Sequence, residues 1–230
     1  MRRFLREQSL SLVFGGLFLA ALAGQAIAGW HDYNNLETWH AQMAGEAPET
    51  IGFGRYLTSS SFAQAVTENW QSEYLQFTLF ILLTVWFIQK GSPESKQPGE
   101  EGGQTDEQQC VGEHAKPTSP RSARIGGWRR KLYENSLVVV MATIWLWSWF
   151  AQSVSGWSEY NAERIEHEQQ PLNWLGYLGS ADFWQTTLQN WQSEFLAVGS
   201  MVVLAIYLRQ RGSPESKPVG AAHDKTAVEG

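Results

Sequence analysis

Four long apolar runs constrain this chain more than any other feature of its sequence. Each run is rich in Leu, Ala or Val, and about 20 apolar residues in a helix cross the ~30 Å hydrocarbon core of a bilayer. The first and third runs reach that length alone, and the second and fourth reach it with the residues that precede them. The runs therefore predict an all-α, integral membrane four-helix bundle, with transmembrane helices at about 8–29, 70–90, 135–156 and 190–209.

The sequence also contains an internal duplication. A shift of 127 residues places 2–34 on 129–161, with 13 of 33 positions identical. A shift of 121 residues places 69–96 on 190–217, with 14 of 28 positions identical. Two spans per copy return the chain to the side of the membrane on which the copy began. We therefore expect two tandem helical hairpins of the same orientation, related by a pseudo-two-fold axis along the membrane normal.

Two short motifs recur without change. The NWQSE motif occupies 69–73 and 190–194, and the GSPESK motif occupies 91–96 and 212–217. Glycine followed closely by proline is typical of a helix C-terminus, because glycine accepts the left-handed conformation and proline cannot continue the helix. The GSPESK motif thus predicts the end of a span, and a docking or modification tag is the alternative interpretation.

The duplication divides the chain into four segments. Residues 1–96 form repeat 1, 97–127 a disordered cytoplasmic linker, 128–217 repeat 2, and 218–230 a disordered tail. The linker is rich in Gly, Glu, Gln, Pro and Ser and nearly free of large apolar residues. Such a stretch cannot bury enough apolar surface to offset the entropy lost on ordering, so we predict disorder.

Basic residues predict the orientation of the spans. Of the 17 Lys and Arg residues, 15 lie in the N-terminus, in the 90–131 connector or in the C-terminal tail from Arg209 onward, and only Arg55 and Arg164 lie in the two intervening loops. Lys and Arg concentrate on the cytoplasmic side of membrane proteins. Both termini are therefore predicted to be cytoplasmic, and the loops at 29–72 and 155–193 to be outside.

The N-terminus resembles a secretory signal, with three Arg residues, an apolar stretch and Ala-Ile-Ala before Gly29. The second copy of this segment is internal and cannot be removed as a signal. We therefore expect the first copy to be a retained helix, with cleavage before Gly29 as the alternative.

The NWQSE motif places one carboxylate inside each of the second and fourth spans. Counting back from Arg209, Glu194 lies about 7 Å inside the outer edge of its span, and Glu73 is its equivalent. Gln152 and Gln25 lie near the outer edges of the other two spans. We interpret these four residues as a polar intramembrane seam between helices. Glutamates hydrated at the interface, or a proton or ion site, are the alternatives.

Tryptophan and serine mark the expected helix boundaries. Trp at membrane interfaces is common, and four residues are predicted as interfacial anchors: Trp30, Trp70, Trp157 and Trp191. Three more lie within the third span, where they face lipid or fill the contact between repeats, an aromatic ligand box being the alternative: Trp145, Trp147 and Trp149. Ser59 and Ser180 predict capped helix starts ahead of spans two and four.

Several function classes are disfavoured. A single Cys excludes an intramolecular disulfide scaffold and any Cys-cluster metal site, and a net charge of −6 argues against nucleic-acid binding. The sequence lacks a phosphate-binding glycine loop, a hydrolase elbow and a zinc-protease motif. We expect no enzyme activity, no cofactor and no metal site. The expected partners are the lipid bilayer and either a second copy or another membrane protein.

The N-terminal RRFLRE and the paired NWQSE and GSPESK motifs resemble an uncharacterised bacterial multi-pass membrane-protein family, classed as a domain of unknown function. The resemblance covers both repeats and implies a bacterial inner-membrane location, but no activity or substrate. Our leading hypothesis is a structural or partner-binding role. The alternative is a subunit of a small transporter or channel that uses the intramembrane carboxylates, and an enzyme comes third.

Overall fold

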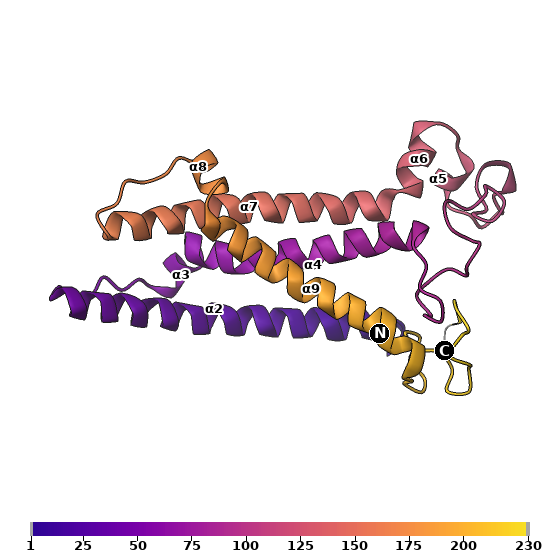
Figure 1. Cartoon of the computed structure of the whole chain (residues 1–230), viewed down its shortest axis with the longest axis horizontal. Coiled ribbons are helices and arrows are strands. Elements are labelled where there is room, and N and C mark those ends of the chain that lie inside the picture. The colour runs from indigo at the N-terminus through magenta and orange to yellow at the C-terminus, as the bar shows by residue number, and fades with distance from the viewer. Residues whose placement is uncertain (1, 229–230) are drawn as a thin grey trace. The chain divides into compact units, whose positions relative to one another are not determined.

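The computed structural model describes residues 2–228, and within them every regular element is helical. Four long helices dominate: α2 (Ser9–Ala44), α4 (Ser60–Trp86), α7 (Ser136–Glu166) and α9 (Ala181–Tyr207). Each contains most of one predicted span (Figure 1). The shorter elements are α1 (Arg2–Glu7), α3 (Phe53–Tyr56), η1 (Gly112–His114), α5 (Arg121–Arg124), α6 (Trp128–Glu134) and α8 (Trp174–Leu178). The all-α prediction is confirmed.

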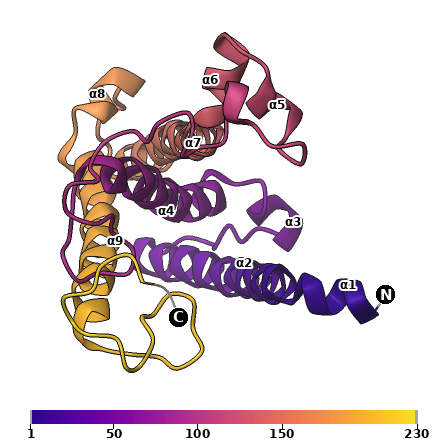
Figure 2. The same ribbon diagram turned by 90° about the vertical axis from the view of Figure 1, so that its right-hand side faces the viewer.

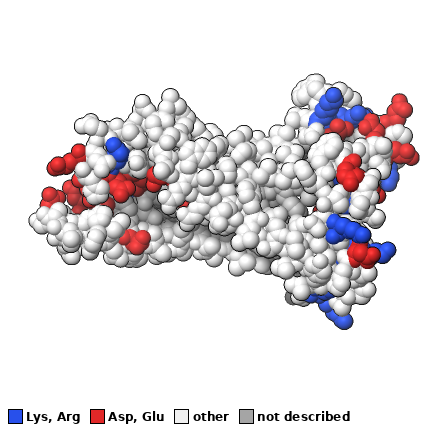
Figure 3. All heavy atoms as spheres, viewed as in Figure 1, with Lys and Arg blue, Asp and Glu red and all other residues white. Residues whose placement is uncertain are grey.

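Two helices, α2 and α7, are long and apolar enough to cross a membrane. Only 6% of the most apolar 18-residue stretch of α2 is buried, and 17% of that of α7. The core helix of a soluble protein has most of its apolar surface buried. Between the charged groups at the helix ends, the visible surface of the long helices is free of Lys, Arg, Asp and Glu (Figure 3).

The first long helix continues well beyond the expected end of the first span. No Gly or Pro occurs between Trp30 and Ala44, so nothing in the sequence interrupts α2 there. Gly45 ends the helix with φ of 75°, and the backbone N–H of Glu46 donates to the carbonyl of Ala41 at 2.8 Å. This left-handed ending is the one that glycine favours. Much of the segment expected as an outer loop is therefore helical.

The predicted serine caps are confirmed. The Ser59 hydroxyl accepts a hydrogen bond from the backbone N–H of Phe62, and the Ser180 hydroxyl accepts one from that of Phe183, both at 3.2 Å. Such caps satisfy backbone donors that have no partner inside the helix. The caps place the starts of α4 and α9 about ten residues ahead of the predicted spans at 70 and 190.

The two copies share local structure at their first helix. The helix breaks at Gln8 (φ −113°, ψ 16°) and at its equivalent Asn135 (φ −111°, ψ 8°). The hydroxyl of the next residue then donates to a carbonyl three residues back in both copies, from Ser9 at 3.0 Å and from Ser136 at 2.8 Å. The duplication is thus visible in backbone conformation as well as in sequence.

The chain divides into two compact units. The first unit comprises Met1–Val66 and Val154–Pro171, and the second comprises Thr67–Ser153 and Leu172–Gly230. Each takes helical segments from both copies of the repeat. The repeat boundaries themselves remain a prediction from the sequence.

In the first unit, α2 holds the chain that follows it. The Trp30 indole N–H donates to the carbonyl of Ile51 at 2.7 Å. The Asn34 side chain donates to the same carbonyl at 3.1 Å and accepts from the Ile51 N–H at 2.8 Å. These bonds satisfy both polar backbone groups of one loop residue. Farther along α2, His40 lies 3.3 Å from the carboxylate of Glu166.

In the second unit, α9 lies across α4, and the short helices α5 and α6 lie together near the start of α7 (Figures 1 and 2). The connector at 97–127 consists of turns with η1 and α5, and Arg130 of α6 lies 3.2 Å from the carboxylate of Asp106. Disorder of the linker and of the tail remains a prediction.

Candidate functional site at the crossing of α4 and α9

The two copies of the NWQSE motif meet where α9 crosses α4 in the second unit. The Trp191 indole N–H donates to the side-chain oxygen of Gln71 at 2.7 Å. One residue earlier on α9, the Asn190 amide donates to the carboxylate of Glu68 at 2.8 Å and to the carbonyl of Thr186 at 3.0 Å. Two side-chain hydrogen bonds therefore join the helices at the repeated motif.

Gln71 is fully buried at this crossing. Its exposure is 0%, and its neighbour Ser72 is also buried. The Gln71 amide nitrogen makes no hydrogen bond to any described residue, although its oxygen accepts from Trp191. A buried amide group with an unmet donor costs free energy, and the bond from Trp191 satisfies only the oxygen of this side chain. Gln71, Leu75 and Thr78 form the buried face of α4, at helical spacing.

The structure places the predicted seam residues in different surroundings. Glu194 is half-buried and Glu73 is exposed, and the two carboxylates are close enough to interact electrostatically. The buried Ser72 hydroxyl donates to the carbonyl of Asn69 at 2.9 Å and lies near the Glu194 carboxylate. Gln152 is buried on α7 in the second unit, whereas Gln25 is exposed on α2 in the first unit. The two glutamates thus act on each other electrostatically, and the seam of four residues remains a hypothesis.

The Trp residues predicted as anchors also hold internal contacts. Trp191 bonds Gln71 and Trp30 bonds the loop carbonyl of Ile51, while Trp70 is exposed and Trp157 is half-buried. Sequence reasoning missed these hydrogen bonds. The feature of the sequence that could have indicated them is that Trp30 recurs as Trp157, and Trp70 as Trp191, in the two copies. Interfacial anchoring of the four residues remains a prediction.

Trp149 is the centre of an aromatic cluster in the second unit. Its ring centroid lies 5.8 Å from that of Trp191 and 6.1 to 6.2 Å from those of three further rings: Trp145, Phe183 and Trp184. The ring of Tyr177 extends the cluster through its contact with Phe183. A cavity of about 270 Å³ opens beside it, lined almost wholly by apolar side chains. This cluster packs α7 against α9 and so supports the crossing from one side.

The serines of the GSPESK motif make the same hydrogen bonds in both copies. The backbone N–H of Gln89 donates to the Ser95 hydroxyl, and that of Gln210 donates to the Ser216 hydroxyl, each at 2.9 Å. The second serine of each motif therefore closes a seven-residue loop soon after the end of a long helix. The shared geometry favours a structural role for the motif over a tag.

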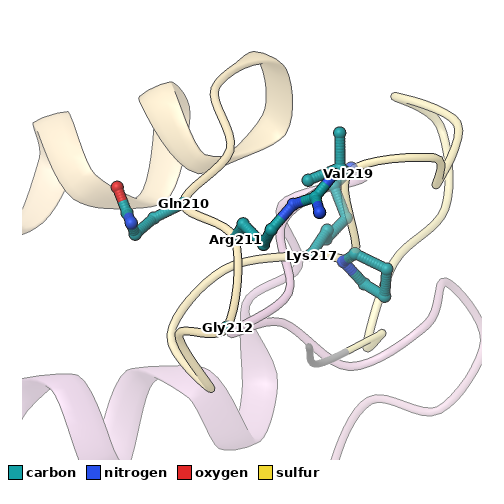
Figure 4. Close-up of a pocket in the computed structure, with 6 residues that line it drawn as sticks. Gln210, Arg211, Gly212, Lys217 and Val219 are labelled. Carbon is teal, nitrogen blue, oxygen red and sulfur yellow. The ribbon is translucent and has the colours of Figure 1, made fainter.

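The motif lysine of the second copy is buried in the loop region. Lys217 donates to the carbonyl of Gly91 at 2.6 Å, and further to the backbone oxygens of Ala222, His223 and Lys225. Burial lowers the pKa of Lys217. A pocket of about 360 Å³ borders this lysine, and in Figure 4 the Arg211 side chain extends along it toward Val219. Lys217 thus ties the tail to the first copy of the motif.

Among residues 2–228, no three His, Cys, Asp or Glu side chains come together as metal ligands would. A family model described as a domain of unknown function (DUF6766) matches residues 1–228. The chain belongs to the DUF6766 family. The match confirms the expected membership of an uncharacterised family. No curated protein and no solved structure matches this DUF6766 chain at a significant level.

Proposed function

We propose that this protein is a multi-pass bacterial inner-membrane protein, with four transmembrane helices and both termini in the cytoplasm. Its role is structural or partner-binding rather than enzymatic. The crossing of α4 and α9 fixes the two repeats in one bundle, and a second copy or another membrane protein binds the assembled helices.

The exposed apolar surface of α2 carries this proposal. Large side chains along the helix have exposed fractions between 58% and 72%, namely those of Leu10, Val13, Phe14, Leu17 and Leu19. Leaving such a side chain in water forgoes about 1.5–3 kcal/mol of burial free energy. A continuous apolar surface of this extent is typical of contact with lipid or with a partner helix.

The apolar halves of α4 and α9 support two further spans. Phe77, Leu82 and Leu83 are exposed on α4, and Leu196 and Leu204 are exposed on α9. Both helices are 27 residues long, which exceeds the length needed to cross a bilayer. The 15 to 2 distribution of Lys and Arg supports the orientation.

The pair of Glu73 and Glu194 favours a second candidate function, a subunit of a small transporter or channel. Two carboxylates that interact within a membrane can share a proton, because like charges disfavour the doubly ionised state. Sharing would make the crossing a proton or ion site instead of a purely structural contact.

Extraction of membranes with alkaline carbonate tests the membrane assignment. The protein should stay in the membrane pellet, and its appearance in the supernatant would contradict integral insertion. A photo-crosslinking residue at Trp39, which is exposed on the outer part of α2, then tests the role. A specific crosslink to a second copy or to one membrane protein supports partner binding. Crosslinks spread over many abundant membrane proteins, as non-specific collisions would produce, contradict it.

Proton flux in proteoliposomes distinguishes the second candidate. A transporter subunit loses flux when Glu73→Gln and Glu194→Gln are introduced together. A structural protein shows the same background permeability before and after the substitutions.

A further inference from the structure

A cavity of about 590 Å³ in the first unit has a lining unlike that of the aromatic cavity in the second unit. Its polar wall is formed by Gln25, Asp32, Tyr33, Tyr56 and Ser61. Ligand sites combine apolar walls with a few convergent polar groups in volumes of about 300–1,000 Å³. The size and lining of this cavity therefore suit a small ligand.

Tyr56 is the buried polar group of this wall. Its side chain is only 4% exposed, and its hydroxyl lies against Gly29, where an added Cβ would come within 2.2 Å of the hydroxyl oxygen. The Tyr56 hydroxyl is absent from the fully enclosed polar atoms that lack a partner, and no hydrogen bond joins it to another described residue, so its oxygen opens onto the cavity. A hydrogen-bonding ligand in the cavity would supply a partner.

The duplication provides an internal comparison for Tyr56. Its equivalent in the second copy is Tyr177, which is 2% exposed and donates its hydroxyl proton to the carboxylate of Asp182 at 3.3 Å. The residue equivalent to Asp182 in the first copy is Ser61, on the cavity wall. In the second copy the tyrosine hydroxyl thus has a carboxylate partner within the fold. In the first copy that carboxylate is absent, and the tyrosine borders the cavity instead.

The charges around the cavity set the sign of the ligand. Asp32, Glu37 and Glu159 act electrostatically on Tyr33 or Tyr56, and within residues 2–228 Arg55 is the one cation that does so. Three carboxylates against one guanidinium leave a formal excess of two negative charges. Burial raises the pKa of Tyr56, so the phenol stays neutral and its oxygen can accept a hydrogen bond.

We propose that this cavity binds a primary organic ammonium group. The ammonium protons would be accepted by the Tyr56 hydroxyl oxygen and the Asp32 carboxylate, with the faces of Tyr33 and Tyr56 adding cation–π attraction. A free amine and the headgroup of an ethanolamine lipid present this same chemistry. The lipid source requires that the span ending near residue 29 crosses the membrane, and the free source does not.

Ligand-observed NMR on the full-length protein in detergent tests the proposal. Ethanolamine should bind with a dissociation constant on the order of 1 mM or lower, and propan-1-ol, which replaces the ammonium by a methyl group, should bind at least about tenfold more weakly. Equal binding of the two compounds, or no binding of ethanolamine up to tens of millimolar, would overturn the proposal.

Matched variants locate the site. Asp32→Asn and Tyr56→Phe should each weaken ethanolamine binding by about tenfold, because each removes one group that holds the ammonium. Tyr177→Phe is the control, since its hydroxyl already has a partner, and it should leave the affinity unchanged. If Tyr56→Phe and Tyr177→Phe behave alike while circular dichroism shows both folded, the proposal fails.

Nanodiscs identify the source of the ammonium. In phosphatidylethanolamine nanodiscs a bound headgroup would raise the apparent dissociation constant of free ethanolamine relative to phosphatidylglycerol nanodiscs. Equal constants in the two lipids indicate a free amine as the ligand. Loss of membrane insertion in the carbonate experiment, with retained ethanolamine binding, would refute the proposed function and leave the ammonium site standing.

Discussion

The indole of Trp191 donates to the side chain of Gln71 at 2.7 Å, joining the second copy of the NWQSE motif to the first. The bond lies at the crossing of α9 and α4, where Gln71 is fully buried. Contact between the two copies explains why the motif recurs in the duplicated chain. Each copy provides one half of the same helix–helix contact.

A double-mutant cycle measures this contact. Trp191→Phe and Gln71→Met each remove one partner and keep most of the side-chain volume. We expect a coupling free energy of about 1 kcal/mol, the usual value for a hydrogen bond between helices. The measurement is chemical unfolding in mixed micelles. The control cycle uses Trp86→Phe with Gln71→Met and should be additive, because Trp86 is exposed and lies about 22 Å farther along α4. Additivity in the Trp191 cycle would show that the hydrogen bond contributes nothing.

Substitutions at the two glutamates should have unequal effects on stability. Glu194→Leu should lower the free energy of unfolding by about 1 kcal/mol, because Glu194 is half-buried beside the polar side chain of Ser72, and leucine offers that group no polar contact. Glu194→Gln keeps a hydrogen-bonding group and should change stability little. Glu73→Leu is the matched control, since Glu73 is exposed. Equal loss from both leucine variants would show that Glu194 has no specific contact.

Much of the architecture followed from the sequence. Apolar run length predicted four helical segments, and Ser59 and Ser180 predicted where two helices begin. Both signals are local, because they depend on residues within one or two turns. The extension of α2 to Ala44 was not predicted, because the end of the first helix was set from the thickness of the bilayer. A helix continues past the membrane until a residue such as Gly45 ends it.

The contacts of the site could be predicted only in part. Residues 71, 75 and 78 share one face of a helix by spacing alone, so burial of Gln71 was accessible from the sequence. The ionisable Glu73 drew attention instead, although it is exposed. The pairing of Gln71 with Trp191 depends on the angle and height at which α9 crosses α4, and a single sequence does not contain that information.

Gly29 allows the close approach of Tyr56 to α2. Gly29→Ala would place a methyl group 2.2 Å from the Tyr56 hydroxyl oxygen, so we expect destabilisation of about 1–3 kcal/mol. Gly24→Ala is the control, because an added Cβ there has no heavy atom within 4 Å among the described residues. Thermal unfolding of the purified protein provides the measurement.

Removing the hydroxyl should relieve the effect of Gly29→Ala. With Tyr56→Phe in the same chain, the nearest ring carbon would lie 3.1 Å from the new methyl group. The double variant should therefore be more stable than Gly29→Ala alone. No recovery would show that the glycine is required for another reason.

The carboxyl of Glu94 predicts a pH dependence in the first GSPESK loop. Burial and the nearby Glu215 carboxylate raise the pKa of Glu94 in the folded protein. The folded state then holds a proton that the unfolded state releases, so the contribution of Glu94 to stability falls as pH rises from the ordinary Glu value through the raised pKa. Glu94→Gln removes this loss.

Unfolding midpoints of the native protein and Glu94→Gln should therefore diverge as pH rises from about 4 to 7, with the variant more stable at neutral pH. Glu107→Gln, in the exposed connector, serves as the comparison. A constant difference between native protein and Glu94→Gln over this pH range would contradict the assigned environment of Glu94.

Cysteine accessibility in intact cells tests the four-span topology most directly. Single cysteines at Glu46 and Glu166, each in a Cys110→Ser background, should react with an impermeant maleimide from outside. Cys110 of the native protein, in the connector, should react only after permeabilisation. Labelling of Cys110 in intact cells, or protection of either outer cysteine until the cells are opened, would contradict the proposed orientation. A mature N-terminus at Gly29 would contradict the four-span arrangement.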